Sequence, residues 1–396
     1  MTEEMVPKQF AISLVCLALA GAFDNHFWRL VVLYVHHQLW ILLVPTSGVV
    51  GLILQVVAMV GIMWIPMFAN FNYRKRQGCI MVTGCDSGMG QATVVHFAQT
   101  NDDSKKGSFE KIFAACYNAQ ASKEYFEKTL TKDQLRHVLV VPLDVTDDKS
   151  CKDAAKTVQS WITNETSSKG LYGIVQYHGV PFFGPACYMP VEMYERQLQV
   201  NFLGFVRIVQ NFMPIMKKRS MTPGRIIFTG TGGGPCSPCP PLLSAYMSSK
   251  FAAESFVHSL RAECYMTRNE ISCVVINPGF VKPTMLVEKG IELTDKMWKI
   301  CEDKQGSTVA KDEYGELANH FTKYSSLQPG THVSEVTKAA EHALLSNVPR
   351  TSYKVGIDSK LAPFVGMMPT GMREKIAIHG IYGILSPAGT VKGYRV

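Results

Sequence analysis

The segment Thr83–Gly90, with the sequence TGCDSGMG, joins the apolar run Cys79–Thr83 to a helical pattern at Met89–Ala98. Glycine permits positive φ, so three glycines in one turn let a pyrophosphate approach the backbone N–H groups at the positive end of a helix dipole. A glycine-rich turn alone is weak evidence for a nucleotide site, but its position directly after a strand strengthens that interpretation. The segment therefore predicts a strand, a phosphate-binding turn and a helix in succession.

Short β-rich runs alternate with helical patterns from residue 78 onward. Such alternation is typical of βαβ units around a parallel sheet. We therefore expect an α/β fold with a doubly wound, Rossmann-like parallel sheet of about seven strands. The expected strands are Cys79–Thr83, Lys111–Cys116, Val138–Leu143, Gly173–Tyr177, Arg225–Thr229, Ser272–Asn277 and Tyr353–Ile357. The expected helices include Met89–Ala98, Ser150–Ile162, Met193–Met216 and Ser244–Met266.

The amino-terminal part of the chain is strongly apolar, and the run from Leu30 through Tyr73 contains no Asp, Glu, Lys or Arg. A helix needs about 20 residues to cross a bilayer, so this run predicts at least one span, with Ser47–Ala69 as the best candidate. We expect residues 1–77 to form a membrane anchor of roughly two or three hydrophobic helices, followed by the α/β domain at residues 78–396. The cluster Arg74-Lys75-Arg76 places that domain in the cytosol by the positive-inside rule.

The composition argues against several classes of protein. Hydrophobic residues make up 47% of the chain and charged residues 18%, which excludes an intrinsically disordered protein. The formal net charge is +8, but Lys and Arg are scattered rather than gathered in tracts, so we do not expect nucleic-acid binding. Eleven Cys at irregular spacing indicate reduced thiols. The Cys236-Ser-Pro-Cys239 pair has no second Cys/His pair at zinc spacing, so no metal site is expected.

Tyr246 and Lys250 lie four positions apart in the expected helix Ser244–Met266 and therefore share one helix face. A phenol with a pKa of about 10 is a poor base at neutral pH, and a neighbouring ammonium lowers that pKa by favouring the phenolate. Spacing alone favours a simpler explanation, an ordinary Tyr–Lys pair on a solvated face, because such pairs are common in helices. The pair is thus a candidate for proton transfer only together with other motifs.

An ordered set of motifs resembles the short-chain dehydrogenase/reductase superfamily between Gly78 and roughly Thr284. The set comprises TGCDSGMG, Asp144, Val200-Asn201, the strand that begins Gly224-Arg225, the run from Tyr246 to Lys250, and Asn277-Pro278-Gly279. Three features most resemble the branch that contains retinol dehydrogenases and 17β-hydroxysteroid dehydrogenase type 2: the motif TGCDSG, the Val-Asn-Phe-Leu-Gly run and the apolar leader. The resemblance implies a nicotinamide-dependent alcohol dehydrogenase.

The resemblance also implies roles for individual residues. Tyr246 would be the general acid/base, Lys250 would lower its pKa and bind the nicotinamide ribose, and Asn201 would hold a water that relays protons. Thr231 would orient the substrate at the position where the family has Ser. The cofactor contacts that the resemblance implies are Gly84, Asp86, Ser87, Gly88, Gly90, Asp144, Gly179, Lys250, Pro278 and Thr284.

Alternatives stay open for several of these residues. Asn201 also fits a helix-interior residue bonded to backbone, and Asp144 fits a turn or helix-capping Asp. Three features depart from the family pattern: Thr231 replaces Ser, the loop from Thr231 to Tyr246 is long, and Gln176-Tyr177-His178-Gly179 replaces Asn-Asn-Ala-Gly. These departures keep a catalytically impaired nucleotide-binding membrane protein as an alternative function.

The cofactor expected from the sequence is NAD, with NADP left open. A 2′-phosphate usually calls for Arg or Lys in the glycine-rich turn or just after the second strand. Neither position carries one, and Asp86 would repel an added phosphate. The acidic residue that would positively select NAD after the second strand is also missing.

We expect a membrane-anchored enzyme that transfers a hydride between NAD and a lipophilic alcohol or ketone such as a steroid or retinoid. A 3-hydroxybutyrate-type dehydrogenase is a further alternative. Residues 282–328 are expected to form the substrate lid, and residues 361–385 suit an interfacial segment in contact with membrane lipid, with plain core packing as the alternative. The resemblance also suggests the endoplasmic reticulum as location and is compatible with a homodimer.

Overall fold

The structure, a computed structural model, describes residues 78–101, 109–165, 168–219, 224–232, 234, 239–284, 290–305, 309–327 and 330–382. The predicted membrane anchor at residues 1–77 lies outside these residues. Among the helices that are described, none has the length and apolar character needed to cross a bilayer. The elements discussed below belong to one compact unit, Arg74–Leu345 together with Ser352–Val396.

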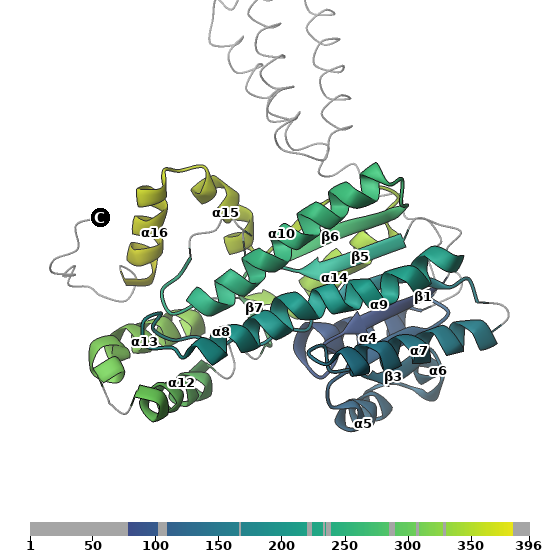
Figure 1. The fold of residues 1–396 in the computed structure, drawn as a ribbon, viewed down its shortest axis with the longest axis horizontal. Coiled ribbons are helices and arrows are strands. Elements are labelled where there is room, and N and C mark those ends of the chain that lie inside the picture. The colour runs from purple at the N-terminus through teal and green to yellow at the C-terminus, as the bar shows by residue number, and fades with distance from the viewer. Residues whose placement is uncertain are drawn as a thin grey trace, which may run out of the picture. The chain divides into compact units, whose positions relative to one another are not determined.

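Seven parallel strands form one sheet in the order β3-β2-β1-β4-β5-β6-β9 (Figure 1). This result confirms the predicted α/β fold, and each strand lies within two residues of its predicted limits. The strand order reverses between β1 and β4, and open α/β sheets bind ligands at such a point, beyond the carboxyl ends of the strands. The strands are β1 (Cys79–Thr83), β2 (Ile112–Cys116), β3 (Val138–Pro142), β4 (Leu171–Gln176), β5 (Gly224–Thr229), β6 (Ile271–Pro278) and β9 (Ser352–Val355).

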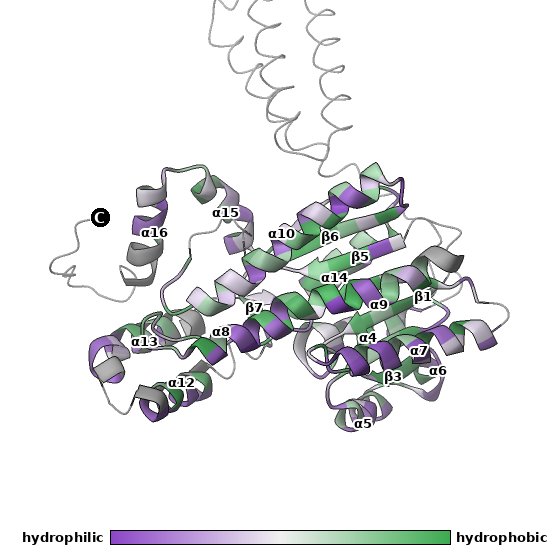
Figure 2. Ribbon diagram, viewed as in Figure 1, coloured by the Kyte–Doolittle hydropathy of each residue, from purple (hydrophilic) through white to green (hydrophobic). Residues whose placement is uncertain are grey.

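The central strands are apolar because helices cover both faces of the sheet. Every residue of β1, β2, β4 and β5 is buried, and strands covered on both sides have continuous apolar runs. Figure 2 shows this concentration of hydrophobic residues on the strands. One face packs against α7 (Asp148–Asn164), α9 (Gly204–Arg219) and α10 (Ser244–Met266), and the other against α4 (Gly88–Thr100), α5 (Ala119–Thr129) and α14 (Val333–Leu345).

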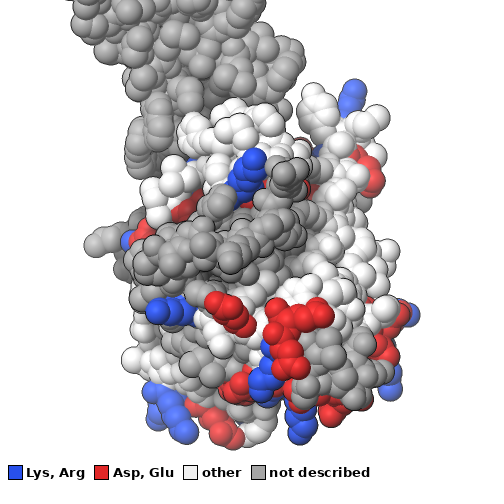
Figure 3. All heavy atoms as spheres, turned by 90° about the vertical axis from the view of Figure 1, so that its left-hand side faces the viewer, with Lys and Arg blue, Asp and Glu red and all other residues white. Residues whose placement is uncertain are grey.

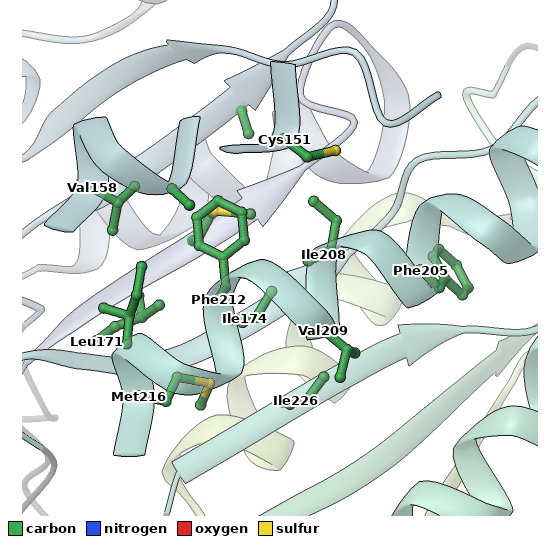
Figure 4. Close-up of a cluster of buried hydrophobic side chains, with 14 of the residues drawn as sticks. Cys151, Val158, Leu171, Ile174, Phe205, Ile208, Val209, Phe212, Met216 and Ile226 are labelled. Atoms are coloured by element: carbon green, nitrogen blue, oxygen red, sulfur yellow. The ribbon is translucent and has the colours of Figure 1, made fainter. Parts of the chain in front are cut away.

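Aliphatic and aromatic side chains fill the layer between the sheet and α7, α9 and α10. Val158 of α7, Phe212 of α9, Ile174 of β4 and Ile226 of β5 all belong to this buried cluster (Figure 4). Because this core fixes α9 and α10 against the sheet, it also fixes the side chains that these helices carry at the carboxyl edge.

The helix predicted at Met193–Met216 has three parts. It begins as α8 (Val191–Leu198), passes through a π-helical turn, η1 (Gln199–Leu203), and continues as α9. A π-turn inserts an extra residue into a helix and often occurs at functional sites. The prediction of one regular helix was therefore wrong in this detail, because hydrophobic periodicity does not show where the extra residue enters.

Several elements after β6 complete the domain. A two-stranded parallel sheet pairs β7 (Val281–Lys282) with β8 (Thr331–His332). The predicted lid region contains α12 (Gly290–Gln305) and α13 (Val309–Leu327). After β9, the chain forms α15 (Ile357–Gly366) and α16 (Thr370–Tyr382). The predicted last strand ends earlier than expected because Gly356, at φ +99°, turns the chain into α15.

Candidate active site

A cleft of about 1090 Å³ opens where β1, β4, β5 and β6 end. It therefore lies at the reversal of strand order that the sheet topology marks as the ligand site. With one exception, Asn201, the predicted site residues all line this cleft. They are Gly84, Asp86, Ser87, Gly88, Gly90, Asp144, Gly179, Thr231, Tyr246, Lys250, Pro278 and Thr284.

The glycine-rich turn after β1 packs directly against neighbouring backbone. Gly84 has φ +69°, and a Cβ there would lie 2.7 Å from the backbone nitrogen of His178. A Cβ at Gly90 would lie 2.3 Å from the carbonyl oxygen of Gly84. Side chains are excluded at both positions, so the turn keeps its backbone close to the cleft.

The amino terminus of α4 is suited to an anion. Ser87 is the N-cap residue, but its side chain makes no capping hydrogen bond, and the first turn contains no acidic residue. The first N–H groups of a helix lack internal partners and carry the positive end of the dipole. Together with the bare glycine backbone, this helix end fits the pyrophosphate of a dinucleotide.

Asp86 joins the glycine-rich turn to the end of β2. Its carboxylate accepts hydrogen bonds from the backbone N–H groups of Tyr117 (3.1 Å) and Asn118 (2.6 Å). The negative charge that the sequence lacks after the second strand is thus supplied there by a residue from the turn after the first strand. Sequence reasoning did not find this contact because the two segments are 31 residues apart.

Asp144 follows β3 and forms a local turn. Its carboxylate accepts hydrogen bonds from the backbone N–H and the hydroxyl of Thr146, at 2.9 and 2.7 Å. The turn interpretation therefore applies to Asp144, although the residue also lines the cleft. The N-cap of α7 is a different residue, Asp147.

Lys250 is buried and belongs to the lining of the cleft. Its Nζ donates a hydrogen bond to the carbonyl oxygen of Thr229 at 3.0 Å. The same atom lies 5.3 Å from the ring centroid of Phe205 and 5.9 Å from that of Tyr246. Burial lowers the pKa of Lys250 to about 8, so the lysine titrates near neutral pH.

Tyr246 is half-buried, and desolvation raises its pKa to about 12. The expected lowering of this pKa by Lys250 is therefore wrong for the structure as it stands. The geometry gives the reason: burial penalises the phenolate, while Lys250 directs its hydrogen bond to the carbonyl oxygen of Thr229. The two side chains nevertheless line one cleft, in keeping with the shared helix face that their spacing predicted.

Asn201 lies in the π-turn η1 and is fully buried. Its Nδ2 donates to the carbonyl oxygen of Val180 and to the hydroxyl of Ser249, both at 3.0 Å, and its Oδ1 accepts from the N–H of Val180 at 2.8 Å. Asn201 therefore ties α10 to the loop after β4. A Cβ at Gly179 would lie 3.3 Å from Asn201 Oδ1, so the glycine keeps this space open.

The remaining predicted residues, Thr231, Pro278 and Thr284, lie at or beyond the ends of β5 and β6 and also line the cleft. The Thr231 hydroxyl is 3.9 Å from the sulfur of Met247. The Thr284 hydroxyl donates to the carbonyl oxygen of Val281 at 2.7 Å, and Pro278 ends β6. Thr231 is half-buried and lines the cleft, so its hydroxyl remains a candidate for binding a substrate oxygen.

His178 is the departure from the family pattern with the most marked environment. It is buried, and its Nδ1 is 2.7 Å from the hydroxyl of Thr83, while its Nε2 has no hydrogen-bond partner among the described residues. Burial and the positive charge of Lys250 hold the pKa of His178 well below its ordinary value. The residue is therefore a neutral link between the turn after β1 and the loop after β4.

The sequence did not show which apolar residues line the cleft. They come from the loop before α10, from α13, from α15 and from α16: Leu243, Phe321, Leu361, Ala362, Val365 and Ile376. These residues come from separate parts of the chain, and no local motif joins them. The lining of the cleft thus combines a glycine-rich turn, a set of apolar side chains, and the pair Tyr246 and Lys250.

We predict that Gly84→Ala reduces dinucleotide affinity at least roughly tenfold. The new Cβ would collide with the backbone of His178, which cannot move aside as a flexible side chain could. Isothermal titration calorimetry with NAD and NADP checks this. Gly371→Ala is the matched control, since nothing lies within 4 Å of a Cβ there. Unchanged affinity in Gly84→Ala would show that the turn does not hold the cofactor.

Comparison with known proteins agrees with this site. The profile of the "short chain dehydrogenase" family matches residues 78–293. Human dehydrogenase/reductase SDR family member 9 is 31% identical over 288 residues, which cover 71% of this chain and 81% of that protein. The 3beta-hydroxysteroid dehydrogenase dhs-16 of Caenorhabditis elegans is 29% identical over 341 residues, 82% of each chain. Rat retinol dehydrogenase 16 is 29% identical over 286 residues, 71% of this chain and 81% of that one.

A solved structure supports the fold independently. The short chain dehydrogenase/reductase from Burkholderia phymatum in complex with NAD superimposes with a TM-score of 0.58 at 17% identity, covering 81% of this chain and 99% of that chain. The family profile extends over more than half of the 396 residues, from the start of β1 into α12. The chain belongs to the short-chain dehydrogenase/reductase family of NAD(P)-dependent oxidoreductases.

Proposed function

We propose that the chain is a membrane-anchored dehydrogenase that transfers a hydride between NAD and a lipophilic alcohol or ketone, such as a steroid or retinoid. One observation carries the proposal. The Tyr246–Lys250 pair lines a single cleft together with a glycine-rich, phosphate-binding turn and an apolar wall built from α13, α15 and α16. An acid/base thus shares one cavity with a cofactor turn and a surface suited to an apolar substrate.

The chemistry follows from these positions. In alcohol oxidation, the phenolate form of Tyr246 accepts the hydroxyl proton while the hydride leaves the carbinol carbon, and a carbonyl product forms; in reduction the phenol gives this proton back to the substrate oxygen as the hydride returns. Bound NAD(P) supplies the hydride acceptor. The Lys250 ammonium stabilises the phenolate that forms on Tyr246, and the Thr231 hydroxyl can donate to the substrate oxygen.

Asp86 supports a preference for NAD over NADP. Its carboxylate is held by two backbone N–H groups at the end of β2, where the adenine ribose lies in folds of this type. A 2′-phosphate placed there would meet a fixed negative charge with no Arg or Lys beside it in the turn. Repulsion without a compensating cation disfavours NADP.

The membrane part of the proposal rests on the sequence. The uncharged run from Leu30 through Tyr73 is long enough to span a bilayer, and Arg74-Lys75-Arg76 favours a cytosolic α/β domain. We propose the membrane of the endoplasmic reticulum as the location. A substrate that partitions into lipid gives such an anchor a purpose, since the enzyme is then held where the substrate is concentrated.

Two other functions have specific support. The raised pKa of Tyr246 and the buried, neutral His178 are features expected of a catalytically impaired nucleotide-binding protein. A 3-hydroxy-acid dehydrogenase would need a cationic carboxylate clamp, and Arg196 is the basic residue besides Lys250 that lines the described cleft. The guanidinium of Arg196 lies 5.3 Å from the ring centroid of Phe182. The apolar lining of the cleft favours a lipophilic substrate over a 3-hydroxy acid.

We predict that Tyr246→Phe lowers kcat for alcohol oxidation by roughly 10²- to 10⁴-fold, since general acid/base catalysis is worth that much. NAD affinity should change less than about twofold, because the phenol oxygen does not belong to the glycine-rich turn that we expect to bind the pyrophosphate. Full-length protein in detergent is assayed by NADH absorbance with steroids, retinoids and 3-hydroxy acids. Tyr265→Phe, at an 87% exposed position on the same helix, is the control. Equal rates in wild type and Tyr246→Phe would contradict the mechanism.

We predict that kcat/KM for carbonyl reduction is flat at low pH and falls above about pH 8. Reduction requires a protonated Tyr246 and a charged Lys250. The lysine loses its charge as pH rises through its pKa of about 8, while the tyrosine, with a pKa of about 12, stays protonated. The Lys250→Met variant should be slow and lack this decline. A variant with the same decline as wild type would assign the titration to another group.

We predict that Asp86→Asn raises kcat/KM for NADP relative to NAD at least roughly tenfold, because it removes a charge next to the 2′ position. Asparagine keeps an oxygen that can accept from the backbone at Tyr117 or Asn118. The ratio of the two kcat/KM values is the measurement, with Asp133→Asn on the exposed surface as control. An unchanged ratio would remove Asp86 from cofactor selection.

A further inference from the structure

Large apolar side chains are exposed on α15 and α16 to an unusual degree. In the described part of the chain, twelve large hydrophobic residues are exposed; five of them lie on these two helices, and a sixth, Met367, directly follows α15. Their exposed fractions range from 40% to 71%. We call them the α15–α16 apolar rim: Ile357, Leu361, Phe364, Met367, Met372 and Ile376. A concentration of this kind marks an interaction surface rather than ordinary surface scatter.

The apolar rim continues into the cleft. Leu361 and Ile376 are 52% and 40% exposed, yet both also line the cavity, together with Ala362 and Val365. These side chains belong to the apolar part of the cleft rather than to the glycine-rich turn. A lipophilic molecule that leaves the cavity past them therefore meets more apolar surface instead of water.

The charges around the rim complement a lipid surface. Lys360 and Lys375 are exposed on the same two helices, and Arg373 is half-buried. Two acidic residues also lie there: Glu374 is exposed between Arg373 and Lys375. Asp358 accepts hydrogen bonds from the N–H groups of Phe280 and Ser359, so three cations stand against two carboxylates. Apolar residues flanked by Lys and Arg are typical of segments that lie in the headgroup region, where anionic lipids attract the cations.

Figure 3 shows the side of the molecule that carries these helices. Charged side chains of both signs gather in its lower half, at the level of α12 and α13, and the described atoms of the upper half, at the level of α15 and α16, are mostly uncharged. The described surface at the level of α15 and α16 therefore carries fewer charged side chains than the surface below it.

We propose that the apolar rim inserts into the surface of a lipid bilayer and passes the lipophilic substrate between the membrane and the cleft. The nature of the substrate rests on the function proposed above, whereas the contact with lipid does not. The occupant is a bilayer rather than a second protein, because the rim combines exposed aliphatic and aromatic side chains with flanking cations in a chain whose uncharged run already predicts membrane attachment.

The first test uses the full-length protein in phosphatidylcholine/phosphatidylserine vesicles that contain a lipid with a diazirine on its acyl chain. Illumination forms a carbene that inserts into neighbouring side chains, and peptide mass spectrometry locates the adducts. We expect adducts within residues 357–376 and none at Tyr265 and Met266, which are 87% and 80% exposed on α10. Adducts confined to residues 30–73 would overturn the proposal, as would cross-links that show the rim covered by a second copy.

The second test separates entry from chemistry. The double variant Met367→Ser/Met372→Ser changes rim residues that do not line the cleft. KM for a steroid or retinoid delivered in vesicles should rise roughly tenfold, since the change removes two apolar side chains from the surface that meets the lipid. KM for a short, water-soluble alcohol and the NAD affinity should stay unchanged.

The control for this second test is Tyr265→Ser/Met266→Ser, which should behave as wild type in every assay. A rise in KM for both substrates of Met367→Ser/Met372→Ser would show a defect inside the cleft and overturn the docking role. Wild-type protein that forms rim adducts but oxidises no alcohol would refute the proposed function and leave the lipid contact standing.

Discussion

The site depends on the close packing of two backbone turns, the one after β1 and the one after β4. Gly84 lies against the backbone of His178 with no space for a Cβ, and the hydroxyl of Thr83 contacts the His178 ring. This contact places the helix end of α4 opposite the loop that holds Asn201 through Val180. The parallel sheet brings the two turns together, because β1 and β4 are neighbouring strands and end at the same edge.

Burial has opposite consequences for the two titrating groups of this cleft. Burial raises the pKa of Tyr246 to about 12 and lowers that of Lys250 to about 8. Both side chains are therefore neutral at a pH between these two values. A proton acceptor in such a site depends on positive charge nearby to form a phenolate. The lysine supplies that charge below about pH 8, where its ammonium form predominates.

Much of this architecture follows from the sequence. The strands could be predicted because helices cover both faces, which leaves continuous apolar runs, and Tyr246 and Lys250 could be paired by helical spacing. Contacts between distant segments could not. The Asp86 carboxylate reaches the residues after β2, η1 interrupts a periodic helix, and the apolar part of the cleft draws on α13, α15 and α16. The pKa of Tyr246 was predicted in the wrong direction because spacing gives proximity but not the cost of desolvation.

The central claim is that the cleft joins a nicotinamide to an apolar alcohol for direct hydride transfer. The most direct measurement gives full-length protein NAD and a steroid or retinoid alcohol that carries deuterium on its carbinol carbon. Mass spectrometry then follows the label. The account predicts a carbonyl product without the label and reduced nicotinamide that carries one deuterium. A carbonyl product with unlabelled nicotinamide, or no product from any lipophilic alcohol while NAD binds, would contradict it.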